Sequence, residues 1–177
     1  MKIIPTKFQG LKIIQSKIYK DSRGFFKEDF KKKFFKSKNF VFGCTSSSKQ
    51  NVLRGLHLQS KFSQGKHLSI LKGEILDVVV DLRKNSKTFG KHFKITLSDK
   101  NGKSLFIPAG FAHGFVGMQK ENIIYYYCTN YRSIKHEVGL LWSDKTLKIR
   151  WPISNPTITE KDKKNLTFNE YKKLYIK

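Results

Sequence analysis

The chain is poor in the residues that mark several protein classes. Its 177 residues include two cysteines, Cys44 and Cys128, which are too few for a disulfide framework and indicate a reducing compartment. Four prolines and 12 glycines exclude collagen-like and low-complexity sequences. No apolar run approaches the ~20 residues of a membrane-spanning helix, and Pro5 and Lys7 interrupt the opening segment where a secretory signal needs an apolar stretch. We therefore expect a single cytoplasmic domain over residues 1–177, with no membrane partner.

The sequence motifs of several large enzyme classes are missing as well. There is no phosphate-binding P-loop, no dinucleotide-binding GxGxxG, no HExxH zinc motif and no GxSxG nucleophile turn. Neither cysteine has a second one at the CxxC spacing of a metal site. These absences remove most of the familiar enzyme signatures.

Acidic residues are scarce, with 13 Asp and Glu against 36 Lys and Arg, so the formal net charge is +23. Such a charge is typical of nucleic-acid-binding proteins. However, arginine occurs only five times, so the other 31 basic residues are lysines, and they are spread along the whole chain. Dedicated nucleic-acid readers rely more on arginine. We interpret the charge as a lysine-rich surface that favours an anionic ligand such as a nucleotide, without a nucleic-acid partner.

Short β-branched and aromatic runs between turn signals predict an all-β fold. The predicted strands are Lys66–Leu71, Ile75–Leu82, His92–Leu97, Leu105–Ile107, His113–Val116 and Ile123–Thr129. Their close spacing favours an antiparallel sandwich or barrel. Helix is predicted only at Phe30–Ser37 and at Thr159–Tyr175, where Thr159 and Asp162 resemble a capping box and Leu166, Phe168, Tyr171 and Leu174 form an apolar stripe.

Polar clusters in four segments are the candidates for chemistry: Asn51–Gln59, Gln64–Lys66, Ile107–Phe115 and Tyr125–Tyr131. The first places Arg54, His57 and Gln59 within six residues, and the third delivers His113 into a strand between two glycines. Taken singly, each has an ordinary structural explanation, since a lone strand histidine is usually a hydrogen-bonded core group.

Together, and in this order, these segments resemble the dTDP-4-dehydrorhamnose 3,5-epimerase family. The matching stretches are DSRGFFKEDF (21–30), NVLRGLHLQ (51–59), QGKHLSILKGEILDVVVDLRKNSKTFG (64–90), LFIPAGFAHGF (105–115), YYCTNYRSIKHEVGLLWSD (126–144), IRWP (149–152) and ITEKD (158–162). The resemblance implies a cupin-like jelly roll, a double-stranded β-helix with short N-terminal and C-terminal helices. It further implies an exchange arm over 1–30, a jelly-roll core over 45–152 and a helical tail over 158–177.

The resemblance also assigns roles to individual residues. Epimerisation beside a ketone needs a base on one face of the sugar, an acid on the other, and hydrogen-bonding or positive groups at the ketone oxygen. By the family match His57 is the base, Asp162 its dyad partner, Tyr126 the acid and Lys66 the group that stabilises the enolate. The residues implied in substrate binding are Arg54, Gln59, His113 and Lys161, together with Arg23, Phe26 and Glu28 from the partner subunit of a strand-exchanged homodimer. No metal and no cofactor are implied.

One segment departs from the family pattern. A Q-x-N-x-S sequence usually precedes the LRGLH block, whereas this chain has Phe42-Gly43-Cys44-Thr45-Ser46. Loss of two amide side chains from a pocket changes its ligand preference, so Phe42 and Cys44 are candidates for substrate specificity. A dTDP-, GDP- or CDP-linked hexose or heptose, inverted at C3, at C5 or at both, remains open, as does the surface polysaccharide (capsule or lipopolysaccharide) that it would serve. The alternatives are a non-catalytic cupin that binds a sugar nucleotide, and a 3,4-ketoisomerase.

Overall fold

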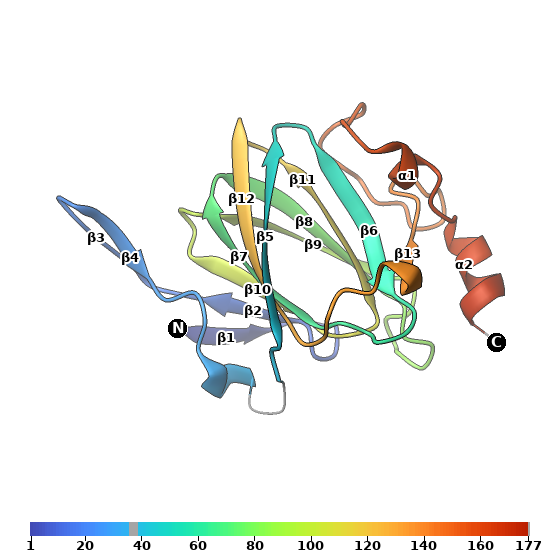
Figure 1. Ribbon diagram of the computed structural model, residues 1–177, viewed down its shortest axis with the longest axis horizontal. Helices are drawn as coiled ribbons and strands as arrows, with labels where there is room; N and C mark the ends of the chain where they lie inside the picture. The colour runs from blue at the N-terminus through green and yellow to red at the C-terminus, as the bar shows by residue number, and fades with distance from the viewer. Residues whose placement is uncertain (36–38, 177) are drawn as a thin grey trace.

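Two antiparallel sheets packed face to face form the body of the protein in the computed structural model, which describes residues 1–35 and 39–176 (Figure 1). One sheet has six strands, in the order β1 (Lys2–Pro5), β2 (Lys12–Gln15), β10 (Lys103–Ile107), β7 (Lys66–Lys72), β12 (Glu121–Cys128) and β5 (Phe42–Lys49). The other has five, in the order β13 (Glu137–Gly139), β6 (Leu53–Gln59), β11 (Phe111–Gly117), β8 (Glu74–Asp81) and β9 (His92–Ser98). The predicted all-β jelly roll is confirmed.

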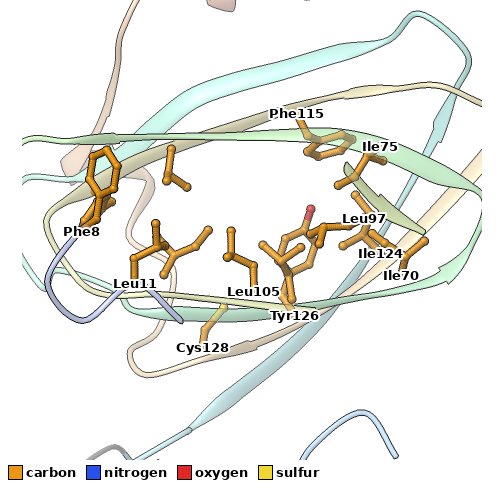
Figure 2. Close-up of a cluster of buried hydrophobic side chains, with 14 residues drawn as sticks. Phe8, Leu11, Ile70, Ile75, Leu97, Leu105, Phe115, Ile124, Tyr126 and Cys128 are labelled. Carbon is orange, nitrogen blue, oxygen red and sulfur yellow. The ribbon is translucent and has the colours of Figure 1, made fainter. Parts of the chain in front are cut away.

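The main core lies between the two sheets, because alternate residues of each strand point inward. Ile70 and Ile124 of the six-stranded sheet meet Ile75 and Phe115 of the five-stranded sheet, and all four are buried (Figure 2). Tyr126 belongs to the same layer, and its hydroxyl points toward the facing sheet (Figure 2). Polar side chains that share the inward positions of these strands must therefore lie inside the sandwich.

A second core covers the outer face of the five-stranded sheet. Val78, Val80 and Ala112 point outward from β8 and β11 and are buried beneath Phe168 and Tyr171 of the C-terminal segment. This packing holds the end of the chain against the sheet that carries His57.

The C-terminal segment forms two short helices, α1 (Glu160–Lys163) and α2 (Phe168–Tyr175), so the single helix predicted over Thr159–Tyr175 is wrong. Between the helices, the Leu166 amide donates to the Gly139 carbonyl and the Leu141 amide donates to the Leu166 carbonyl, so that Leu166 is extended against Leu140. These long-range hydrogen bonds override the helical pattern. The reciprocal capping box is found at Thr167 and Glu170 of α2; the other expected box is only half formed, because Thr159 accepts from the Asp162 amide while the Asp162 side chain turns elsewhere.

A hairpin of β3 (Ile18–Asp21) and β4 (Gly24–Lys27) extends away from the body (Figure 1). Its base is anchored on the outer face of β7, where the Lys27 Nζ donates to the Ile70 carbonyl at 2.6 Å and forms an ion pair with Asp29 at 3.3 Å. Strands β1 and β2 pair within the six-stranded sheet, so the arm predicted over 1–30 is too long and the core predicted over 45–152 too short. The arm is the hairpin 18–27.

The outer face of the six-stranded sheet is covered by the segment that follows the arm. A 3₁₀ turn, η1 (Lys32–Phe35), replaces the first part of the helix predicted at Phe30–Ser37, and the last two residues of that prediction lie outside the described residues. Phe30, Phe35 and Tyr127 surround His67, which is fully buried. No helix in the described part of the chain is long and apolar enough to cross a membrane.

Candidate active site

A cavity of about 490 Å³ opens between the two sheets where β5, β7 and β12 face β6 and β11. It brings together ten of the thirteen residues that the sequence singled out: Phe42, Cys44, Arg54, His57, Gln59, Lys66, His113, Tyr126, Lys161 and Asp162. Residues more than a hundred positions apart thus share one site.

His57 and Asp162 form a hydrogen-bonded pair on one wall of the cavity. The His57 Nε2 lies 2.6 Å from the Asp162 Oδ1, and the other carboxylate oxygen accepts the Gly55 amide at 3.3 Å. Burial alone would raise the pKa of Asp162, but the hydrogen bonds from His57, Gly55 and Asn165 and the nearby imidazole outweigh it, and the pKa lies below its usual value. A carboxylate held ionised in this way fixes the imidazole ring and stabilises its protonated form, which suits a general base.

Gly55 allows β6 to present this pair. Its φ of +111° is open only to glycine, and a Cβ there would lie 2.6 Å from the His113 carbonyl oxygen of β11. The register shifts at this point, so that His57 pairs with His113 and Arg54 with Phe115. Because of this irregularity, Arg54 and His57 both border the cavity although they are three positions apart.

Tyr126 borders the cavity from the opposite sheet. It is nearly buried, and its hydroxyl lies 3.3 Å from the Ser46 Oγ. Burial is the main reason that the pKa of the phenol lies well above its usual value. The phenol therefore carries its proton at neutral pH and can donate it only to a strongly basic centre.

Lys66 is the first residue of β7, and it lies opposite Cys128 in the register with β12. Burial lowers the pKa of the Lys66 ammonium, with partial compensation from nearby acidic groups. Burial likewise raises the pKa of the Cys128 thiol to about 12, so this cysteine is an uncharged part of the wall. Lys66 lines the cavity and forms no ion pair with the described carboxylates, and an anion bound in the cavity would stabilise its ammonium form.

A second histidine–aspartate pair lies deeper in the sandwich. The His113 Nε2 is 2.7 Å from the Asp77 Oδ2, and both residues are buried. The sequence reasoning singled out His113 but missed Asp77, although a charged residue at an inward position of the apolar run ILDVVVDL is a usable signal. Asp77 fixes the orientation of the His113 ring.

Charged residues at the mouth of the cavity were also missed. Glu137 forms ion pairs with Lys161 and with Arg132, and its pKa lies below its usual value because these cations and His57 outweigh the effect of burial. Glu137 and Arg132 lie inside the stretch 126–144 that carried the family resemblance. Their approach to Lys161 depends on the pairing of β13 with β6, which no local pattern predicts.

Three predicted site residues lie on or beside the arm, away from the cavity. Phe26 is 65% exposed, Arg23 is exposed and paired with Asp21, and Glu28 forms an ion pair with Lys31. These three residues do not line the cavity. In the described part of the chain, no group of three or more His, Cys, Asp or Glu side chains could hold a metal ion.

Comparisons with known proteins place nearly the whole chain in one family. The family model described as dTDP-4-dehydrorhamnose 3,5-epimerase matches residues 5–170. The dTDP-4-dehydrorhamnose 3,5-epimerase of Shigella flexneri is 42% identical over 168 residues, covering 92% of this chain and 93% of that protein. The crystal structure of the dTDP-6-deoxy-D-glucose-3,5-epimerase of Legionella pneumophila, in complex with dTDP-4-keto-L-rhamnose, superposes with a TM-score of 0.90 at 40% identity, over 95% of this chain and 93% of the other. A 4-keto-6-deoxy sugar epimerase of Streptomyces spheroides superposes with a TM-score of 0.93 at 26% identity, over 98% of this chain and 90% of the other. The chain is thus a member of the dTDP-4-dehydrorhamnose 3,5-epimerase family.

Proposed function

We propose that this protein is an isomerase that epimerises a nucleotide-linked 4-keto-6-deoxy sugar at C3, at C5 or at both. The observation that carries the proposal is the placement of two proton-transfer groups across one cavity: His57 of β6, hydrogen-bonded to Asp162 of α1, and Tyr126 of the facing sheet. The related proteins from Shigella and Legionella are named for dTDP-linked substrates, which favours dTDP as the carrier.

In the proposed reaction each of these groups has one role. The 4-keto group makes the protons at C3 and C5 acidic, and the neutral His57 imidazole removes one of them while Asp162 stabilises the imidazolium that forms. The electron pair moves onto the ketone oxygen, where Lys66 and His113 stabilise the enolate. Tyr126 then returns a proton to the same carbon from the opposite face, and the configuration is inverted.

Two further groups suit the phosphates and the sugar. Arg54 borders the cavity while its Nε and one Nη are held by Ser48 and by the Ser47 carbonyl, so its guanidinium is presented in one orientation. A fixed guanidinium is well matched to a diphosphate. Lys161 adds a cation beside Asp162 at the mouth.

We infer that the active form is a homodimer that exchanges its hairpin arms. Tyr19, Phe25 and Phe26 are 52%, 55% and 65% exposed on a two-stranded hairpin, an arrangement that is marginally stable in isolation. Seating the arm on a second copy would bury these rings and bring Arg23 and Glu28 to the nucleotide end of the partner's cavity.

The β5 wall of the cavity restricts which substrates fit. Phe42 and Cys44 point into the cavity, so this wall offers a ring and a thiol where the family pattern has amides. We propose that this wall determines which sugar or which nucleotide base is bound. The substrates that follow from this are a heptose, or a sugar carried on GDP or CDP, beside the dTDP-linked hexose. The product would serve cytoplasmic precursor synthesis for a surface polysaccharide such as capsule or lipopolysaccharide.

The proposal is tested by NMR in D₂O with 4-keto-6-deoxy sugars carried on dTDP, GDP and CDP. Deuterium entry at C3 or C5 in the wild-type protein, and its loss in His57→Asn, is the expected result. Binding without exchange would identify a non-catalytic cupin. Movement of the carbonyl from C4 to C3 would identify a ketoisomerase.

A further inference from the structure

The side chain of Gln59 is fully engaged by the backbone of two loops. Its Nε2 donates to the Phe62 carbonyl at 2.8 Å and to the Tyr131 carbonyl at 3.3 Å, and its Oε1 accepts the Ser133 amide at 2.7 Å. Gln59 is 8% exposed, so these bonds are shielded from water. The amide that the sequence assigned to substrate binding has no free donor left for a ligand.

The two loops, residues 60–64 and 129–136, contribute Gln64 and Arg132 to the lining of the cavity, are called its rim here, and are joined by further bonds. The Gln64 Nε2 donates to the Asn130 carbonyl at 2.6 Å, and the Gly65 amide donates to the Thr129 hydroxyl at 2.8 Å. The Ser60 hydroxyl donates to the His136 carbonyl at 3.1 Å. Gln59 is the member of this set that holds both loops through one side chain.

The rim holds side chains that would be mobile without such support. Phe62 has a φ of +52°, a left-handed conformation that a bulky residue rarely adopts, and its carbonyl is the closer acceptor of the Gln59 Nε2. Tyr131 is 66% exposed, and Arg132 borders the cavity beside it. The Tyr131 ring lies near Phe42 of the cavity wall, with the two ring centroids 6.4 Å apart, and an aromatic ring and a guanidinium so placed suit the flat base and the phosphates of a nucleotide.

We propose that Gln59 is a positioning residue that fixes the rim before substrate arrives, and thereby sets the affinity for the nucleotide end of the substrate. This inference rests on the proposed function. A prearranged rim lowers the cost of ordering two loops on binding. Since the hydrogen bonds of the Gln59 side chain to the described residues go to loop backbone and not to the proposed proton-transfer groups, its loss raises KM and leaves kcat nearly unchanged.

Two variants distinguish the role of the Gln59 amide nitrogen, which donates, from that of its oxygen, which accepts. Gln59→Met removes all three hydrogen bonds at similar volume. Gln59→Glu keeps an acceptor for the Ser133 amide but removes both donors to the Phe62 and Tyr131 carbonyls. For both variants we expect KM and the Kd for dTDP to rise about tenfold, which is about 1.4 kcal/mol, with kcat within about twofold of wild type.

Amide hydrogen exchange gives a readout that does not depend on turnover. We expect faster exchange at Ser133 in Gln59→Met and unchanged exchange in Gln59→Glu, because only the second variant keeps the acceptor. The control is Gln50→Met, which removes one exposed hydrogen bond to the Met118 carbonyl. It should change neither the Kd for dTDP nor the exchange rate of the Ser133 amide.

The outcomes are distinguishable. An unchanged Kd for dTDP in both variants overturns the proposal, and so does a fall in kcat at constant KM, which would place Gln59 among the reacting groups. If Gln59→Met does not fold, Gln59→Glu decides. If the wild type binds dTDP but turns over no 4-keto sugar, the proposed reaction fails, and the Kd and the Ser133 exchange still decide the role of Gln59.

Discussion

His67 makes the stability of the protein depend on pH. It lies on the outer face of β7, fully buried under Phe30, Phe35 and Tyr127. Its Nε2 is 2.9 Å from the Ser104 Oγ, and its Nδ1 has no hydrogen-bond partner among the residues that the structure describes. Burial lowers the pKa of its imidazole to about 4, against a smaller opposing effect from Asp29. The folded protein therefore holds this histidine neutral.

The magnitude follows from proton linkage. In the unfolded chain the imidazole titrates near 6.5, so below that pH the unfolded state binds a proton that the folded state does not. The free energy of unfolding is unaffected above pH 6.5, falls as the pH drops from about 6.5 to about 4, and loses nothing further from this group below that. The difference between the two pKa values corresponds to roughly 3 kcal/mol, a large part of the stability of a typical domain.

Denaturant unfolding between pH 7.5 and pH 4 tests this reasoning. Carboxylates also titrate in this range, so the quantity to compare is the difference between wild type and His67→Gln, which does not titrate. We expect the wild type to lose about 3 kcal/mol more than the variant over this range. Ser104→Ala, which removes the hydrogen bond but keeps the buried imidazole, serves as the control and should retain the wild-type pH dependence.

Parallel curves for wild type and His67→Gln would refute the argument. They would mean that the imidazole is protonated in the folded protein despite its burial, or that it is solvated through opening of the segment that covers it.

Three further predictions concern the site and the arm. Asp162→Asn should leave the fold intact but slow solvent exchange by about 100-fold or more, because His57 loses the carboxylate that stabilises its protonated form; an unchanged rate by NMR would remove Asp162 from the dyad. Tyr126→Phe should retain deuterium exchange but lose inversion, as the base alone returns the proton to the face it came from; equal loss of both would contradict the assigned role. Lys27→Met should lower the free energy of unfolding by about 2 kcal/mol and raise KM with little change in kcat, since it frees the arm from the Ile70 carbonyl; an unchanged KM would show that the arm is placed by other contacts.

Local pattern predicted six strands that match β7 to β12, because alternation of inward and outward residues is a short-range property, and it did not pick out β1 to β5 or β13. The run 75–82 illustrates this, as its β-branched residues form β8 with Val78 and Val80 on one face and Val79 on the other. The same pattern failed at residues 164–167, where the pairing of Leu166 beside Leu140 breaks a helix that local propensity favours.

The candidate site was predicted mainly from resemblance, and its supporting contacts were not. The pairing of His57 with Asp162 came from a family pattern, whereas no spacing argument links positions 105 residues apart. Asp77, Glu137 and the engagement of Gln59 depend on which strands are neighbours, and a single sequence does not contain that information. Gln59 shows the consequence, since a residue type suited to binding a ligand is used to hold the backbone.

The hydrogen bond between His57 and Asp162 joins residues that are synthesised far apart in time. The ribosome completes every strand of both sheets before it adds residues 159–162, and the aromatic residues that fasten this segment, Phe168 and Tyr171, come later still. A nascent chain can therefore close its sandwich while its base still lacks a carboxylate. If His57 and Asp162 act as the proposed pair, a chain that ends before residue 159 folds its sheets but has no activity.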